Sequence, residues 1–294
     1  MTTSVRRARR PASLPQRRTV PRRTVPRRTV SRRTVPGWAV AVAGVLGALV
    51  IAVTALLAGG QRHTDTTPVA LPPPPTATVA EINGRQIPVR EFALYLAQGR
   101  AATFAHFAKT YGVGDGPHFW TTPHGGTTPA AYLKRHALAE AAQDTVVLLL
   151  AHQHHLIADP GYDAFLATWT AENTRRRQAV AAHQVIYGPV QYTEANYFTY
   201  VLHNLDAGLE QVLAKDGTIP TPDSALRAYY RDHLDTFRQQ EDRKGAITTP
   251  PFGEVAAQVR QSYVHDRYEA MTDRLARAAR TTVAQAVYDS VPVH

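Results

Sequence analysis

The feature that most constrains this chain is an uncharged apolar run of 21 residues from Trp38 to Ala58, WAVAVAGVLGALVIAVTALLA. At a helical rise of about 1.5 Å per residue, the run is roughly 30 Å long, which matches the hydrocarbon core of a bilayer. We therefore predict that residues 37–59 form one transmembrane helix. A cleaved signal peptide is the alternative. Its apolar region is usually only about 7–15 residues long, so we favour an uncleaved signal anchor.

Residues 1–36 contain twelve arginines and neither Asp nor Glu, and from Arg17 they repeat the pentamer RRTVP or RRTVS. Proline at every fifth position excludes a helix, and the scarcity of apolar residues excludes a core, so we predict a disordered tail. Basic flanks stay on the cytoplasmic side, which places the residues after 60 outside the membrane. In this topology the tail is expected to contact anionic lipids of the inner leaflet.

The formal net charge of +10 comes from this tail, because the rest of the chain has 21 Lys and Arg against 23 Asp and Glu. The folded part therefore lacks the basic footprint of a nucleic-acid-binding protein, and we predict no nucleic-acid partner. Cysteine is absent. Disulfides, thiolate metal sites, cysteine nucleophiles and lipid attachment through cysteine are therefore excluded.

Residues 60–77 form a proline-rich linker in which Pro72 to Pro75 favour extended polyproline geometry, so the linker is a semi-rigid spacer. Residues 78–288 follow as one mainly α-helical domain with a small sheet. Thr78–Ile82 and Gln86-Ile87 are predicted strands, joined by the hairpin signal Asn83-Gly84. Apolar periodicity and Gly or Pro boundaries predict helices over residues 89–111, 129–155, 161–182, 193–214, 221–237 and 250–280. Residues 281–288 are predicted to form a strand on the exposed edge of the hairpin.

Three segments carry a resemblance to a known family: VAEINGRQIPVREF from Val79, TPDSALRAYYRDHLDTF from Thr221, and the helix that opens with FGEV at Phe252. In this order, behind an export segment, they resemble the SurA/PrsA-type extracytoplasmic foldases. The resemblance covers most of residues 78–288. It implies a helical chaperone domain in which the N-terminal and C-terminal segments fold together.

The chain departs from that family between the second and third segments, where full-length foldases carry a parvulin-type prolyl isomerase domain. Here Phe237 and Phe252 are separated by RQQEDRKGAITTPP, which is too short for a domain. The resemblance therefore implies a holdase that binds unfolded or exported polypeptides without catalytic residues or a cofactor. Two alternatives stay open: an isomerase-related foldase with residual activity, and an adaptor for one secreted partner.

A holdase needs exposed apolar surface, and aromatic residues around two predicted connections are candidates for it. Each of them has burial in the core as its alternative. The candidate peptide-binding residues are Phe104, Phe107, Tyr111, Phe119 and Trp120 near the first loop, and Tyr192, Tyr197 and Tyr200 at the fourth helix.

Histidines at the end of the second predicted helix raise the question of a metal site. His152 and His155 can share a helix face, and Asp159 is near in sequence as a third ligand. Histidine near a helix C-terminus also interacts favourably with the free carbonyls, and we prefer that interpretation and predict no metal. The sequence contains no HExxH, phosphate-loop or GxSxG pattern.

Overall fold

The computed structural model describes residues 72–240 and 247–293, which belong to one compact unit that begins at Thr66. The predicted tail, the predicted transmembrane helix and most of the linker lie outside the described residues. Within the described ranges, no helix is both long and apolar enough to cross a bilayer.

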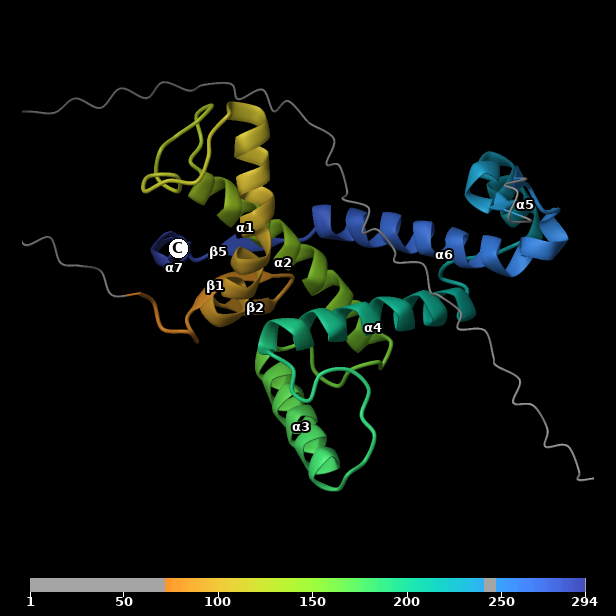
Figure 1. Cartoon of the computed structure of the whole chain (residues 1–294), viewed down its shortest axis with the longest axis horizontal. Coiled ribbons are helices and arrows are strands. Elements are labelled where there is room, and N and C mark those ends of the chain that lie inside the picture. Colours follow the sequence, from red (N-terminus) through yellow and green to blue (C-terminus); the bar gives the residue numbers. More distant parts are fainter. Residues whose placement is uncertain (1–71, 241–246, 294) are drawn as a thin grey trace, which may run out of the picture. The chain divides into compact units, whose positions relative to one another are not determined.

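The described part is mainly helical, with a small three-stranded antiparallel sheet, as predicted (Figure 1). The fifth predicted helix ends early, at Asp232, and continues as the short 3₁₀ helix η1, Leu234–Phe237. The other predicted helices are confirmed to within a few residues. The helices are α1 Val89–Tyr111, α2 Pro129–Gln153, α3 Tyr162–Ala181, α4 Glu194–Lys215, α5 Asp223–Asp232, α6 Phe252–Arg277 and α7 Gln285–Ser290.

Two threonines explain where α2 and α4 begin. The Thr128 hydroxyl accepts the N–H of Ala131 at 3.1 Å, and the Thr193 hydroxyl accepts the N–H of Asn196 at 3.2 Å. Each hydroxyl satisfies one of the backbone donors that the first turn of a helix leaves unpaired. α1 begins directly after Pro88, whose missing N–H costs nothing at this position.

The sheet has the strand order β2-β1-β5, with β1 at Thr78–Ile82, β2 at Arg85–Pro88 and β5 at Thr281–Val283. Asn83 and Gly84 form the predicted two-residue turn, with φ of 49° and 86°. β5 pairs antiparallel with β1, so the predicted neighbour is confirmed. A two-stranded pair, β3 Gln239–Gln240 and β4 Ile247–Thr248, follows η1.

The prediction of a strand over residues 281–288 is wrong beyond Val283, because residues 285–290 form α7. Val287 and Tyr288 are both partly buried against the core. Adjacent residues of a strand point to opposite faces, whereas one helical turn can direct both toward the same side. The Tyr288 ring lies 5.7 Å from the Phe92 ring, and this packing favours the helix.

Within the described part of the chain, buried apolar side chains form two clusters. The main core joins the hairpin, α1, α2, α4, the second half of α6 and the buried Val291 and Val293. A smaller core joins α5, η1 and the first half of α6, and its buried members are Leu226, Phe237, Val255, Val259 and Tyr263. Thus α6 contributes to both cores, and α5 packs along its first half (Figure 1).

Candidate functional site

The first group of predicted binding residues packs mostly into the domain. The Phe104, Phe119 and Trp120 rings contact one another with centroids 4.4–5.1 Å apart. Phe107 is completely buried and Phe119 nearly so, while Phe104 and Trp120 are half-buried. Only Tyr111 of this group is substantially exposed, at 40%. The main contribution of this group is therefore to hold the loop after α1 against that helix.

The second group forms a cluster of tyrosines at the start of α4. The Tyr192 and Tyr200 rings stack with centroids 5.4 Å apart, and the Tyr197 ring lies 6.0 Å from Tyr200. Tyr197 is buried, Tyr192 is half-buried and Tyr200 is 48% exposed. This group therefore presents one accessible aromatic edge.

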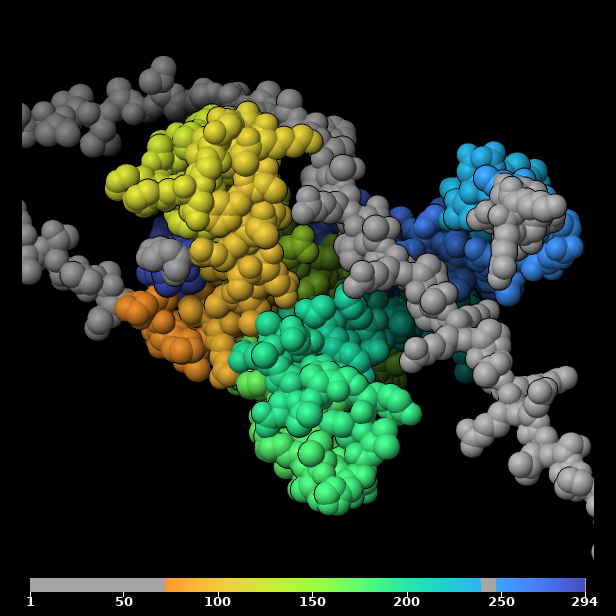
Figure 2. Space-filling model, in the orientation of Figure 1, coloured from red at the N-terminus to blue at the C-terminus, as the bar shows by residue number. Residues whose placement is uncertain are grey.

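Further apolar residues beside these tyrosines are exposed on the connection between α3 and α4, which lies at the surface (Figure 2). Val185 is 82% exposed and Tyr187 is 87% exposed. Neither residue is among the predicted binding residues, although the apolar run VIY directly before Gly188-Pro189 indicates them. We name this surface the α3–α4 patch, and it consists of Val180, Val185, Tyr187, Val190, Tyr192 and Tyr200.

Arg176 of α3 holds the backbone of the α3–α4 patch. Its guanidinium is buried and donates to the carbonyl oxygens of Tyr187 at 2.9 Å and Pro189 at 2.7 Å. The guanidinium carbon also lies 4.5 Å from the centre of the Tyr192 ring. The exposed side chains are thus presented by an anchored loop.

A buried ion pair joins the turn end of the hairpin to the first turn of α1. Arg85 donates two hydrogen bonds to the carboxylate of Glu91, at 2.8 and 3.1 Å, and both side chains are almost completely buried. Arg85 also donates to the carbonyl oxygen of Pro160 at 2.7 Å. Burial raises the pKa of Glu91, and the charge of Arg85 lowers it by less. Arg85 therefore fixes the hairpin to both α1 and the segment before α3.

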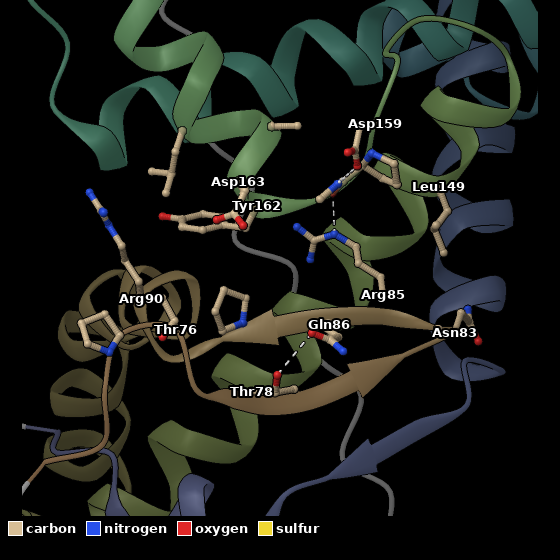
Figure 3. Close-up of a pocket in the computed structure, with 17 residues that line it drawn as sticks. Thr76, Thr78, Asn83, Arg85, Gln86, Arg90, Leu149, Asp159, Tyr162 and Asp163 are labelled. Carbon is tan, nitrogen blue, oxygen red and sulfur yellow. Dashed lines mark hydrogen bonds between the residues drawn. The ribbon is translucent and has the colours of Figure 1, made fainter.

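Beside this ion pair is a hollow of about 600 Å³, which we name the β2 hollow. It lies between β2, residues 75–76, residues 159–161 and the first turns of α3. Figure 3 shows Arg85 extending from β2 toward the segment that carries Asp159. The predicted aromatic residues do not line it. The polar and charged residues around it include Asn83, Gln86, Arg90, Asp159 and Asp163.

A second hollow of about 320 Å³ shares Arg85, residues 159–161 and Ala164 with the first. We name it the apolar hollow, because its lining is almost entirely aliphatic or aromatic. It lies among the end of α2, α3 and α4, and its lining includes Leu148, Leu156, Ile157, Phe165, Phe198 and Leu202. The two hollows together offer an apolar chamber next to a polar, charged one.

Across residues 72–240 and 247–293, no group of three His, Asp or Glu side chains is arranged to hold a metal ion. The Asp159 carboxylate accepts the N–H of Gly161 at 2.6 Å, and His154 Nδ1 lies 3.5 Å from Asp216. The Asp159 carboxylate and His154, at the end of α2, therefore already have partners in the local structure.

Asp144 of α2 is a partly buried acid whose change of protonation with pH can be tested. Burial, reinforced by the charge of Glu140, raises the pKa of Asp144 to about 8. The unfolded carboxyl releases its proton near its ordinary pKa of about 4. Between about pH 4 and pH 8 the folded state therefore binds more protons than the unfolded state. The free energy of unfolding of the wild-type chain falls as the pH rises through this range. We expect Asp144→Asn to raise the free energy of unfolding at pH 8 by about 1–3 kcal/mol.

Urea unfolding of both proteins at pH 5, 7 and 9 checks this prediction. The stability gain of Asp144→Asn should increase from pH 5 to pH 8 and stay constant above it. Asp163→Asn, at an exposed position in the first turn of α3, is the control and should have only a small effect on stability. A gain for Asp144→Asn that is equal at pH 5 and pH 9 would contradict the prediction.

Comparison with known proteins gave no match of this chain to a family model, a curated protein or a solved structure.

Proposed function

We propose that this chain is a membrane-anchored extracytoplasmic holdase that binds unfolded or exported polypeptides. In this proposal residues 37–59 are the anchor, and the arginine-rich tail contacts anionic lipids of the inner leaflet. The sequence resemblance to the SurA/PrsA-type foldases supports the class of function. A holdase requires accessible apolar surface and no catalytic side chain.

The observation that carries the proposal is the α3–α4 patch. Its aliphatic members and Tyr187 are exposed, while its loop is fixed by Arg176 through two carbonyl oxygens. Tyrosine offers a large contact area with few rotatable bonds and a polar end that tolerates water. Such a surface fits weak binding of apolar segments with varied sequences.

The origin of the patch in one stretch of chain supports a second candidate, an adaptor for one secreted partner. The exposed apolar residues of the patch come from one connection and the helix ends beside it, between Val180 and Tyr200. Exposed apolar side chains on one region of a soluble domain also mark specific protein interfaces. The two candidates differ in the number of clients that they accept.

The experiment measures both aggregation and refolding of several unrelated clients whose slow refolding phase is limited by proline isomerisation. The full-length chain is added in a zwitterionic detergent. We expect suppressed aggregation of several clients at an unchanged slow phase. The variant Val185→Ser, Tyr187→Ser, Val190→Ser should lose most of this effect. The matched control Leu234→Ser, Ile247→Ser changes exposed apolar residues elsewhere and should keep it.

Each other outcome has a distinct meaning. A faster slow phase would favour the isomerase-related alternative. Tight binding of one secreted protein, with no effect on unrelated clients, would favour the adaptor. Equal activity of the patch variant and the wild-type chain would remove the α3–α4 patch from the proposal.

A further inference from the structure

Strand β2 is an edge of the three-stranded sheet, since the strand order is β2-β1-β5. The two-residue turn makes Ile82 and Arg85 the first hydrogen-bonded pair of the hairpin, and Glu81 is opposite Gln86. In an antiparallel ladder the hydrogen-bonding direction alternates, so the N–H and C=O of Gln86 point away from β1. Gln86 also lines the β2 hollow (Figure 3). The free edge therefore offers a backbone donor and acceptor next to the space in the hollow.

The charges around the β2 hollow leave an excess of carboxylate. Arg85 is paired with Glu91, and Arg90 is paired with Glu194 at 2.7 Å. Within the described residues, Asp159 and Asp163 have no cationic partner, and Asp163 is exposed. The Asp159 carboxylate accepts one backbone N–H and keeps further acceptor capacity. A cationic side chain complements this lining.

We propose that the β2 edge binds an extended, basic polypeptide segment by strand addition. The segment pairs its backbone with Gln86 and places a Lys or Arg side chain against Asp159 and Asp163. A neighbouring apolar side chain enters the apolar hollow, which shares Asp159, Pro160 and Gly161 with the β2 hollow. The inference rests on the proposed polypeptide-binding function, and it concerns a surface other than the α3–α4 patch.

The backbone contact confers little sequence preference, because every non-proline residue carries the same donor and acceptor. The two carboxylates confer the preference for basic segments. The short stretch of free edge keeps the binding weak, which suits a protein that must release its clients.

The probe is an acetylated, amidated octapeptide of alternating lysine and valine with a fluorescent label. Its binding to the full-length chain in zwitterionic detergent is measured by anisotropy at low salt. One matched peptide has glutamate in place of lysine, and another is the lysine peptide with its central backbone amides N-methylated. We expect the lysine peptide to bind, and each matched peptide to bind at least about tenfold more weakly.

Two pairs of protein variants test the other side of the contact. Gln86→Pro removes the outward N–H and Gln86→Ala keeps it. Proline is tolerated on an edge strand where the N–H faces outward. We expect about tenfold weaker binding for Gln86→Pro alone. Asp163→Asn should weaken binding several-fold, whereas Glu254→Gln, in the first turn of α6, should not. Should Gln86→Pro fail to fold, the N-methylated peptide tests the same hydrogen bonds.

Equal binding of the N-methylated and parent peptides would overturn strand addition, as would equal binding by the two Gln86 variants. Self-association of the wild-type chain that Gln86→Pro abolishes would place a second copy at this edge and would also overturn it. Peptide binding that depends on Gln86 in a chain without holdase activity would uphold this inference and refute only the proposed function. Holdase activity without such binding would uphold the proposed function and refute only this inference.

Discussion

Replacing Arg85 by alanine is expected to lower the free energy of unfolding by about 3–5 kcal/mol. The change leaves the buried Glu91 carboxylate without its cation and the Pro160 carbonyl without its donor. Because burial already raises the pKa of Glu91, the variant is expected to bind a proton there and to be less destabilised at low pH. Urea unfolding followed by circular dichroism at pH 7 and pH 5 measures both effects.

Arg90→Ala is the matched control, because it removes an arginine five residues away whose ion pair with Glu194 is partly exposed to solvent. We expect it to cost less than about 1 kcal/mol. The double variant Arg85→Met, Glu91→Met replaces both charges by apolar side chains and should recover most of the loss. If Arg85→Ala costs no more than Arg90→Ala, the ion pair does not fix the hairpin.

Phe237→Ala is expected to cost about 3–5 kcal/mol, with the effect confined to the smaller core. Phe237 is completely buried and packs with Leu226, Val259 and Tyr263. Because this cluster is separate from the main core, α5 and the first half of α6 should open while the main core stays folded. Amide hydrogen exchange should show lost protection in these segments and retained protection in α1, α2 and α4.

Leu209→Ala is the comparison in the main core, where Leu209 is completely buried on α4. It is expected to cost about 2–5 kcal/mol and to reduce protection in α1, α2 and α4 as well. Loss of protection throughout the domain in Phe237→Ala would mean that the two clusters unfold together.

The helices could be predicted from the sequence because their apolar spacing and their boundaries are local signals. Gly112 after α1 has a left-handed backbone, and proline or a capping threonine precedes α1, α2 and α4. The Asn83-Gly84 turn fixed the hairpin for the same reason. The end of β5 could not be predicted from local signals, because the packing of Tyr288 against Phe92 favours a helix after this strand.

The candidate site was less predictable. The sequence pattern of an aromatic residue at helical spacing does not show whether its ring is buried, as in Phe107, or exposed, as in Tyr200. The hollows form where Arg85 meets Pro160, and these residues are far apart in the sequence. Arg85 and Glu91 both lie in the segment VAEINGRQIPVREF, but their pairing could not be predicted, since a buried ion pair depends on the tertiary fold.

The pairing of β1 with β5 has a consequence for the synthesis of this chain. Ile82 is opposite Thr281, and Val291 and Val293 are buried in the main core. At about 5–20 residues per second, a ribosome needs roughly 10–40 s to make the intervening segment of about 200 residues. Until then the second edge of β1 is uncovered and the core lacks its final side chains. A newly made copy is therefore, for that interval, the kind of polypeptide that a holdase protects.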